Sequence, residues 1–282
     1  MQPTSLSIIV LTYHEELHLA RCLESVKSVA GEIVVVDSFS TDGTREIAES
    51  YGAKFVQHEF VNQAQQFNWA LDNLPISGEW ILRLDADEYI TPELAREIKE
   101  TISINQPENQ RESAHAVNGY YIKRRVYFLE RWIKHGGYYP IWILRLFRKG
   151  KARSEEREMD EHIEVFEGRV EKLDYDFVDD NKKGLALWTA KHNDYSTREV
   201  FSRLRERSSG PQGGESGRRP FRSGIFSILP PLWRAFCYFS YRYILRLGFL
   251  DGKEGLIFHV LQGFWYRFLV DAKLYESRIK KI

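Results

Sequence analysis

Cysteine is scarce in this sequence of 282 residues, which contains only Cys22 and Cys237. Two cysteines so far apart match neither the closely spaced pairs that ligate zinc nor the several bridges that staple a small secreted domain. The sequence therefore predicts a protein of a reducing, cytosolic compartment, and it excludes a metal site built on cysteine pairs.

Targeting signals and long apolar runs are also lacking. The start, Met1-Gln2-Pro3-Thr4, is polar and leads straight into an apolar run, so we expect no signal peptide. A bilayer-crossing helix needs about 20 consecutive apolar residues. The two most aromatic segments, 230–250 and 255–270, are both broken by arginine, so neither is expected to cross a membrane.

Net charge is absent as well, but the two signs are unevenly distributed along the chain. From Lys182 onward there are 19 Lys or Arg against 8 Asp or Glu, and this part also holds the aromatic segments. Aromatic side chains mixed with arginines favour helices that lie in the lipid headgroup region, where arginine meets phosphate. The alternatives are a packed helical subdomain and an oligomer interface. No nucleic-acid-binding module is recognisable, so no nucleic acid is expected as a partner.

The hydrophobic content of 43% and the length suffice for one substantial core. In the first part of the chain, apolar runs of buried-strand type alternate with helical patterns. Strands are expected at 6–11, 32–37, 54–57 and 80–85, with helices at 19–26 and 45–51. This alternation predicts an α/β fold with a mostly parallel central sheet, whose ligands bind beyond the carboxyl ends of the strands.

Two carboxylates stand at the end of one of these strands. Asp85 and Asp87 follow the apolar run 80–84 and lie two residues apart, so their side chains point the same way. Converging carboxylates repel each other, and a divalent cation with hard oxygen ligands, Mg²⁺ or Mn²⁺, relieves the repulsion. The alternative is that Asp87 and Glu88 open a solvated loop before a helix cap at Thr91.

Three short motifs are informative through their order and spacing. They are T-Y-x-E at 12–15, V-V-D-S-x-S-T-D-G-T at 35–44 and D-A-D-E at 85–88. Together they resemble the inverting glycosyltransferases of family 2, which have the GT-A fold, a Rossmann-like sheet. The stretch 132–147 is similar to the bacterial branch that acts on lipopolysaccharide-core or exopolysaccharide acceptors.

The resemblance implies a role for each matching residue of the donor site. Asp37 would hydrogen-bond the uracil of a nucleotide-sugar, although Ser38 stands where many members have a second Asp. Thr12 and Glu15 would line the nucleotide pocket. Asp85 would contact ribose or metal, and Asp87 would hold the Mg²⁺ or Mn²⁺ ion that bridges the diphosphate.

Further candidates come from later motifs. Asn68 falls where the family often has an Asn near the donor, with a solvated helix face as the alternative. An inverting transfer needs a general base for the acceptor hydroxyl, and the resemblance implies Glu161, with Asp160 as the second choice and plain surface charge as the alternative. His135 and Arg145 are candidates for acceptor or phosphate contacts. A structural histidine and a solvent-exposed strand arginine are the alternatives.

The domain organisation expected from these patterns has four parts. A GT-A catalytic domain covers 1–181, a helical connection 182–206, a flexible Gly- and Ser-rich linker 207–222, and an amphipathic, membrane-associating helical region 223–282. Attachment would be peripheral or monotopic, on the cytoplasmic face of the inner membrane.

The function expected is metal-dependent, inverting transfer of a sugar from a nucleoside-diphosphate-sugar, with a UDP-sugar as the first choice, to a hydroxyl of a lipid-linked glycan acceptor. One alternative is a nucleotidyltransferase of sugar phosphates, but such enzymes carry a basic, Gly-rich loop after the first strand, where this chain has Glu15 and Glu16. Another is a membrane-bound interaction protein without activity, which the retained acids argue against.

Overall fold

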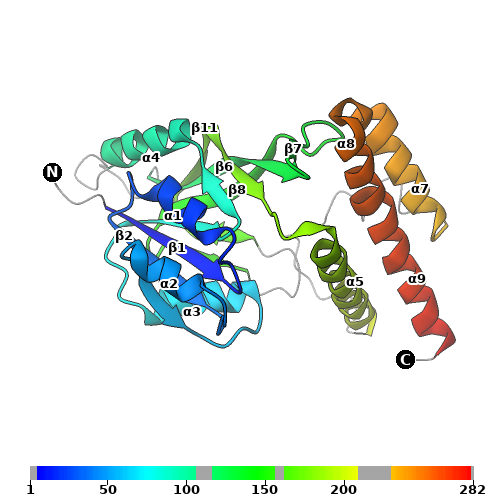
Figure 1. The fold of residues 1–282 in the computed structure, drawn as a ribbon, viewed down its shortest axis with the longest axis horizontal. Coiled ribbons are helices and arrows are strands. Elements are labelled where there is room, and N and C mark those ends of the chain that lie inside the picture. Colours follow the sequence, from blue (N-terminus) through cyan, green and yellow to red (C-terminus); the bar gives the residue numbers. More distant parts are fainter. Residues whose placement is uncertain (1–4, 106–115, 156–161, 209–229, 281–282) are drawn as a thin grey trace. The chain divides into compact units, whose positions relative to one another are not determined.

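The structure is a computed structural model that describes residues 5–105, 116–155, 162–208 and 230–280 (Figure 1). By their contacts these residues form two compact units. The first comprises Met1–Tyr127 and Pro140–Lys182, and the second Phe128–Tyr139 and Lys183–Ile282, within the described ranges. The predicted linker at 207–222 lies almost wholly outside the described residues.

A single large sheet organises the first unit. Its first four strands run parallel in the order β3 (Lys54–Gln57), β2 (Glu32–Asp37), β1 (Leu6–Thr12) and β4 (Trp80–Asp85). Between them the chain forms α1 (Leu19–Val26), α2 (Thr44–Ser50) and α3 (Gln63–Asn73). The predicted alternation of strands and helices, and the α/β fold that follows from it, are confirmed.

Beyond β4 the sheet becomes mixed. It continues through β8 (Ile141–Arg148), β6 (Val117–Phe128), β11 (Arg169–Asp180) and β5 (Glu88–Ile90). β8 is antiparallel to both β4 and β6, β11 is parallel to β6, and β5 is antiparallel to β11. A separate hairpin pairs β9 (Ala152–Ser154) with β10 (Ile163–Val165). The first unit also contains α4 (Pro92–Ile104).

Both faces of the parallel part are covered, which explains why its strands are apolar throughout. In β1, Ile8 and Val10 belong to a core with residues of α1 and α4, whereas Ile9 and Leu11 face a second core with Phe67 of α3. Each such side chain contributes roughly 1.5–3 kcal/mol when fully buried. A continuous apolar run is therefore the pattern expected of a strand covered on both sides.

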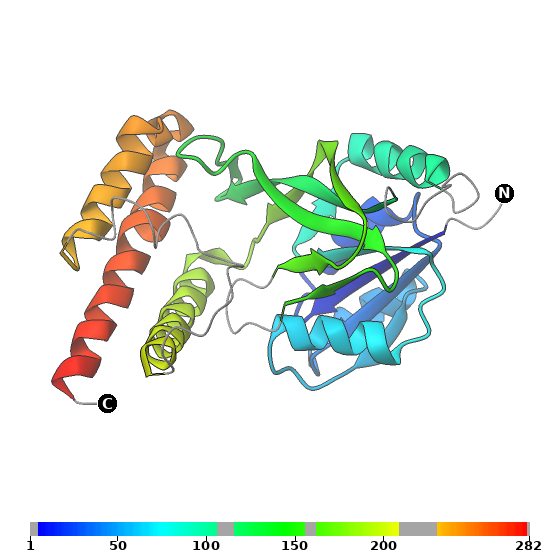
Figure 2. The same ribbon diagram turned by 180° about the vertical axis from the view of Figure 1, so that it is seen from behind.

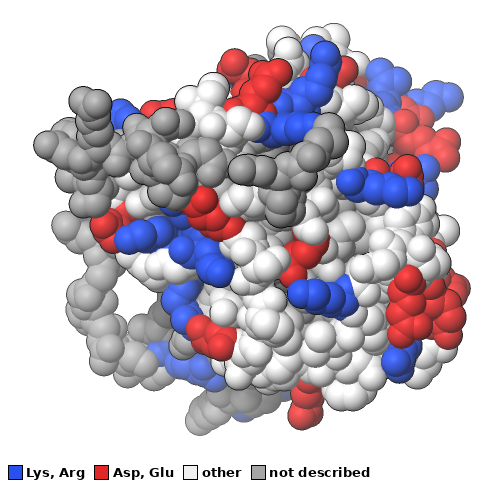
Figure 3. All heavy atoms as spheres, turned by 90° about the vertical axis from the view of Figure 1, so that its left-hand side faces the viewer, with Lys and Arg blue, Asp and Glu red and all other residues white. Residues whose placement is uncertain are grey.

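The surface of the described residues carries both signs of charge. On the face seen in Figure 3, acidic and basic side chains of the described residues are interspersed with uncharged surface.

The second unit is helical. It contains β7 (Arg131–Trp132), α5 (Gly184–Ser208), α7 (Trp233–Ser240) continued by η4 (Tyr241–Leu245), the turn η5 (Gly248–Asp251), and α8 (Gly252–Phe258), η6 (His259–Trp265) and α9 (Tyr266–Ile279) in succession. Figure 2 shows α5 beside α9 and α7 beside the helix that leads into α9. Val200, Val270 and Leu274 form a small core between α5 and α9.

His259 lies in a closely packed part of the second unit. His259 is fully buried, and a Cβ added to Gly136 or Gly248 would come within 2.5 Å of its ring. Gly136 also has φ +68°, so a side chain there would strain the backbone as well as clash with the ring. Burial, followed by the charge of Arg242, lowers the pKa of His259 to about 4, while Asp251 opposes the shift.

The depressed pKa of His259 makes the second unit sensitive to acid. Its ordinary value is about 6.5, so the unfolded chain binds more protons than the folded chain between the two values. Stability should be fully present above about pH 6.5 and decline toward pH 4, by up to about 3 kcal/mol. Urea unfolding measured across this range should show a weaker pH dependence in His259→Gln than in the wild type. An equal slope in both would contradict the assignment, and His162→Gln, which removes an exposed imidazole, is the control.

Candidate active site

The carboxyl ends of three neighbouring strands meet at one edge of the sheet. In the strand register, Thr12 of β1 is opposite Asp37 of β2, and Leu11 of β1 is opposite Asp85 of β4. Parallel pairing therefore brings together side chains that are 25 to 73 positions apart in sequence. Thr12, Asp37 and Asp85 lie at this edge as the sequence predicts.

Asp37 is the anchor of the loop that follows β2. Its carboxylate is completely buried and accepts hydrogen bonds from the Thr12 hydroxyl at 2.9 Å, the Ser40 amide at 2.7 Å, the Ser40 hydroxyl at 2.5 Å and the Gln57 side chain at 3.3 Å. Any ligand that bonds this carboxylate directly has to replace one of these donors. Ser38 accepts from Gln66 at 3.3 Å, so the residue that departs from the family pattern is also tied to the fold.

Glu15 is oriented by a histidine that the sequence did not single out. The backbone N–H of Lys182 donates to Nε2 of the buried His18 at 2.9 Å. Because a backbone amide can only donate, Nε2 carries no proton, and Nδ1–H donates to Oε2 of Glu15 at 2.7 Å. Glu15 also donates its backbone N–H to the Thr44 hydroxyl at 2.8 Å, so its position is fixed from two sides.

Asp85 belongs to a buried charge cluster. Nη2 of Arg145, on β8, lies 3.2 Å from Oδ2 of Asp85 and 2.5 Å from Oε1 of Glu88. The other oxygen of Glu88 accepts the Asp85 backbone N–H at 2.9 Å, and Arg83 lies 3.7 Å from Asp85. Arg145 and Arg83 thus place positive charge beside Asp85, in addition to any divalent cation.

Burial dominates the ionisation of this cluster. Glu88 and Arg145 are only 2% and 6% exposed. Burial raises the pKa of Glu88, and the charge of Arg145 works against this shift and favours the ionised carboxylate. The pKa of Arg145 is itself raised, because the attraction of Glu88 and Asp85 outweighs its own burial.

Asp87 is held by the segment that follows β11. Oδ2 of Asp87 accepts from the Asn181 side chain at 2.8 Å, and its backbone carbonyl accepts from the Asp180 N–H at 3.2 Å and from Arg21 at 3.3 Å. Arg21 also binds the Asp180 carboxylate at 2.5 Å. The side chain of Asp87 stays partly exposed at the strand edge.

The donor chemistry of this edge fits a hard divalent cation. Asp85, 25% exposed, and Asp87 offer carboxylate oxygens, which Mg²⁺ and Mn²⁺ prefer. Within the described ranges, no three side chains of the His, Cys, Asp and Glu types are grouped as a complete metal site. An ion bound by these two acids would take its further ligands from water or from a substrate.

Asn68 is buried on α3 and contacts β9. It is 5% exposed, so a solvated helix face is wrong. Its amide group donates to the Ser154 carbonyl at 2.9 Å and accepts from the Ser154 N–H at 3.0 Å. The side chain therefore fastens β9 to α3. Because both ends of the amide are occupied, it has little capacity left to bind a nucleotide-sugar.

The remaining candidates fall in different places. His135 belongs to the second unit, where its backbone N–H and Nδ1 contact the two oxygens of buried Asp251 at 2.8 and 2.6 Å. Arg145 is buried in the first unit, so the alternative of a solvent-exposed strand arginine is wrong. Asp160 and Glu161 lie outside the described residues.

Three functional neighbours were missed from the sequence: His18, Arg21 and Asn181. Arg21 and Asn181 contact residues far away along the chain, and His18 contacts Lys182 in addition to the nearby Glu15, so no local pattern marks these contacts. Asn181 offered one signal, since it immediately follows the last residue of β11 and thus stands at a strand end.

The chain is similar to a family model, to curated proteins and to solved structures. The model of the family Glycosyl transferase family 2 matches residues 7–150. The chain is 29% identical over 300 residues to "Lipopolysaccharide core biosynthesis glycosyltransferase LpsC" of Rhizobium meliloti (strain 1021), across 98% of this chain and 94% of the relative. An uncharacterized glycosyltransferase of Rickettsia bellii (strain RML369-C) is 40% identical over 94 residues, 33% of this chain and 31% of the relative. The crystal structure of S. aureus TarS 1–349 in complex with UDP-GlcNAc superposes with a TM-score of 0.47 and 16% identity over 98% of this chain and 92% of that chain.

Removal of the Arg145 charge should destabilise the first unit strongly. Arg145→Met leaves Glu88 and Asp85 without their partner, and breaking a buried pair in this way costs roughly 3–5 kcal/mol. The additional change Glu88→Gln removes the uncompensated charge and should restore part of the loss. The free energy of unfolding, from urea titration, measures both. As a control, Arg124→Met removes a partly exposed pair with Asp179 at 3.6 Å and should cost at most about 1 kcal/mol. The assignment fails if the double variant is as unstable as Arg145→Met.

Proposed function

The chain belongs to glycosyl transferase family 2 and is a glycosyltransferase, and we propose that it transfers a sugar from a nucleoside-diphosphate-sugar to a hydroxyl of a lipid-linked glycan. The resemblance found in the sequence is thereby confirmed at the level of the family. The finer parts of the proposal are the donor, the metal ion, the general base and the acceptor.

One observation carries the proposal for the donor site. Thr12, Asp37 and Asp85 end three adjacent parallel strands in register, and Asp87 follows on the same edge. In a sheet of this type, ligands bind beyond the carboxyl ends of the strands. A UDP-sugar is the first choice of donor because Asp37, whose carboxylate would accept from an imide N–H, stands where the family contacts uracil. The internal donors to Asp37 would have to yield to that contact.

Asp87, with Asp85, would hold a Mg²⁺ or Mn²⁺ ion. The ion would supply Lewis-acid stabilisation of the charge on the departing diphosphate, a contribution of several kcal/mol. Two further side chains support these ligands. Asn181 orients the Asp87 carboxylate through its 2.8 Å hydrogen bond, and Arg145 restrains the Asp85 carboxylate from the opposite side.

The remaining requirement is a base for the acceptor hydroxyl. Inversion requires the acceptor oxygen to attack the sugar from the face opposite the leaving group. The base therefore has to come from a segment other than the one that holds the metal. Glu161 is the first choice and Asp160 the second, from their position in the motif at 159–164. The ends of this segment are defined, because Ser154 pairs with Ile163 and the Glu155 N–H donates to the His162 carbonyl at 2.8 Å.

A lipopolysaccharide-core acceptor is supported by the name of the relative from Rhizobium meliloti, which matches nearly the whole chain. An exopolysaccharide acceptor would use the same chemistry. In both cases the acceptor is a sugar hydroxyl on a lipid-anchored glycan, which requires the enzyme to work at a membrane surface.

Two substitutions separate the metal site from the base. In an assay of nucleoside diphosphate release from a panel of nucleotide-sugars with Mg²⁺ or Mn²⁺, Asp87→Ala should slow turnover about 10²–10³-fold. Glu161→Gln should slow it about 10²–10⁴-fold while leaving donor binding by calorimetry unchanged. Asp174→Ala, an exposed acid of the same unit, is the matched control.

The outcomes discriminate between the two roles. Turnover of Asp87→Ala equal to that of the wild type would remove the metal from the mechanism. Full activity of Glu161→Gln, combined with a loss in Asp160→Asn, would transfer the role of base to Asp160.

We further propose that the second unit attaches to the cytoplasmic face of the inner membrane. Within the described residues, every helix is too short or too polar to serve as a bilayer-spanning segment. The end of η4 and the turn that follows it nevertheless expose Leu245, Leu247, Phe249 and Leu250, at 73%, 46%, 46% and 49%. Apolar side chains gathered at one turn favour shallow insertion into the interface.

Charge placed in this turn should weaken attachment. Burial of a Phe or Leu side chain in the interface is favourable by about 1.5–3 kcal/mol, so Phe249→Glu or Leu250→Glu should reduce binding to lipid vesicles by at least about tenfold. Co-sedimentation with vesicles measures the loss. Ile104→Glu, which alters an exposed apolar residue of the first unit, should leave binding unchanged. Equal binding of all variants would contradict insertion through the turn.

A further inference from the structure

Two arginines of the second unit bring their terminal nitrogens to the same glycine. Arg242 belongs to η4 and Arg246 directly follows that helix, whereas Gly137 lies in the loop after β7. A Cβ atom placed on Gly137 would stand 3.4 Å from Nη2 of Arg246 and 3.6 Å from Nη2 of Arg242. Gly137 is exposed, and both distances are measured from one point. A single small oxyanion there can therefore accept from both guanidinium groups.

Neither arginine has a carboxylate partner among the described residues. Arg242 donates to the Gly136 carbonyl at 2.6 Å and to the Tyr238 hydroxyl at 2.5 Å. Arg246 donates to the Tyr241 hydroxyl at 3.4 Å. Adjacent guanidinium groups repel each other, so an anion that neutralises them is bound favourably.

The contacts of Arg242 orient its guanidinium group without neutralising it. The group lies over the ring of Tyr138, 4.0 Å from the centroid, while Nε and Nη1 donate to the two acceptors named above. Nη2 is thereby held beside Gly137. A donor that is already oriented loses little conformational entropy when a ligand binds.

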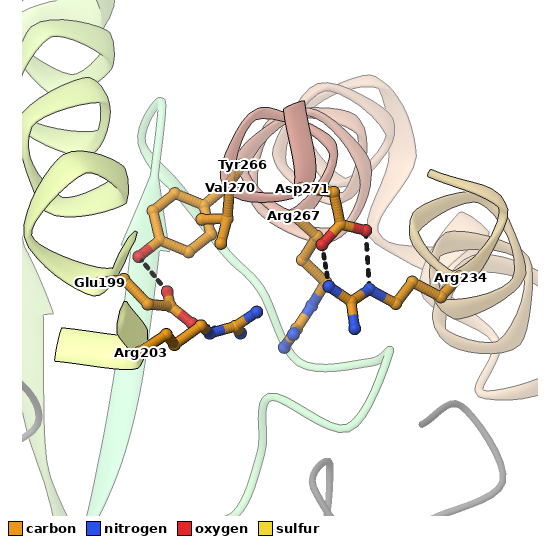
Figure 4. A pocket seen from close by; sticks show the side chains of 7 residues that line it. All are labelled: Glu199, Arg203, Arg234, Tyr266, Arg267, Val270 and Asp271. Atoms are coloured by element: carbon orange, nitrogen blue, oxygen red, sulfur yellow. Dashed lines mark hydrogen bonds and ion pairs between the residues drawn. The ribbon is translucent and has the colours of Figure 1, made fainter. Parts of the chain in front are cut away.

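The arginines of the pocket shown in Figure 4 have a different arrangement. Arg203 of α5, Arg234 of α7 and Arg267 of α9 contribute to its lining. Arg203 donates to Glu199 at 2.5 Å, and Arg234 donates through Nε to Asp271 at 2.6 Å. Two of these three arginines thus already have carboxylate partners, which leaves the pair beside Gly137 as the stronger candidate for binding an anion.

The chain around Arg246 also exposes apolar side chains. Leu245 and Leu247, directly before and after Arg246, are 73% and 46% exposed. Leu247 has φ +60°, a backbone conformation that is unfavourable for leucine. The segment 230–250 contains three arginines and no Asp or Glu. Cationic donors and exposed apolar residues in one short segment match a phospholipid, which offers phosphate oxygens above an apolar layer.

We propose that Arg242 and Arg246, beside Gly137, form a binding site for the phosphate of an anionic membrane phospholipid. Nη2 of each arginine donates to the phosphate oxygens, and Leu245 and Leu247 enter the interface. Free inorganic phosphate carries the same oxygens but has no apolar part. This proposal rests on the attachment of the second unit to a membrane and names the lipid group that the unit recognises.

One substitution closes the site without changing any charge. Gly137→Ala puts a methyl group at the point that lies within 3.6 Å of both Nη2 atoms. It also strains the backbone, because Gly137 has φ +76°. Gly184→Ala is the matched control, since Gly184 belongs to the same unit, has φ +83° and would place its Cβ with no atom within 4 Å.

A second pair of variants tests the charge. Arg246→Gln removes a guanidinium group whose bond to Tyr241 is long, at 3.4 Å, so the fold should be retained. Lys253→Gln removes an exposed cation near the start of α8 and is the control for general electrostatic attraction. Circular dichroism and thermal melting confirm that each variant is folded.

Binding of the full chain is measured by co-sedimentation with two sets of vesicles. The first contains phosphatidylcholine with phosphatidylglycerol, and the second carries the same surface charge from a fatty-acid carboxylate. Loss of one cation near an anionic surface weakens binding by about fivefold, so Lys253→Gln should lose no more than this on either set. Arg246→Gln should lose about tenfold or more on phosphatidylglycerol and only the general fivefold on the fatty acid.

The uncharged substitutions should separate the two lipids more sharply. Gly137→Ala should lose about threefold or more on phosphatidylglycerol, because a hydrogen-bonded phosphate is displaced, and nothing on the fatty acid. Gly184→Ala should bind both sets as the wild type does.

Each outcome has one meaning. Equal binding of Gly137→Ala and Gly184→Ala to phosphatidylglycerol overturns the site, as do equal losses in Arg246→Gln and Lys253→Gln. Inorganic phosphate that binds as tightly as phosphatidylglycerol vesicles, measured by calorimetry, assigns the arginines to a soluble anion and overturns the lipid. Failure of the wild type to bind either set contradicts membrane attachment itself, and nucleoside diphosphate release remains a separate measure of the transferase site.

Discussion

The neutralisation of buried negative charge at the end of β4 is the interaction on which this edge of the sheet depends. A charged group removed from water costs several kcal/mol, which a well-placed partner has to offset. Arg145 meets this requirement because one of its nitrogens lies between Glu88 and Asp85. Since Glu88 also accepts the Asp85 N–H, the end of β4, the start of β5 and the middle of β8 are held as one rigid piece. The position of Asp87 follows from that rigidity.

A second set of contacts ties the same edge to the end of β11. Arg21 bonds the side chain and carbonyl of Asp180, Asn181 bonds Asp87, and the N–H of Lys182 bonds His18. The chain leaves the first unit directly after these residues. Asp87, one of the two acids proposed for the metal, and Glu15, proposed for the nucleotide pocket, are therefore supported by one short segment with no recognisable motif.

The sequence could predict the acids of the site but not their partners. Continuous apolar runs marked β1, β2 and β4, and strand polarity then placed Thr12, Asp37 and Asp85 at one edge without further information. Arg145 and Asn68 could not be placed in the same way, because their contacts depend on the antiparallel strand β8 and on the hairpin strand β9, whose pairing no local pattern shows. His135 is a similar case, since its partner Asp251 is 116 positions away. Helical periodicity indicated α5, but not which of its arginines would meet those of α7 and α9.

The attachment of β9 by Asn68 has a consequence for how this enzyme can diversify. One amide side chain binds the backbone of Ser154 as a neighbouring strand would, and Ser154 pairs with Ile163. The eight residues enclosed by that pair, 155–162, therefore begin and end at points fixed by the scaffold. Neither end of this interval is paired with β1, β2 or β4, the strands that carry Thr12, Asp37 and Asp85. The segment proposed to carry the general base can therefore change in sequence without moving the acids proposed for the nucleotide.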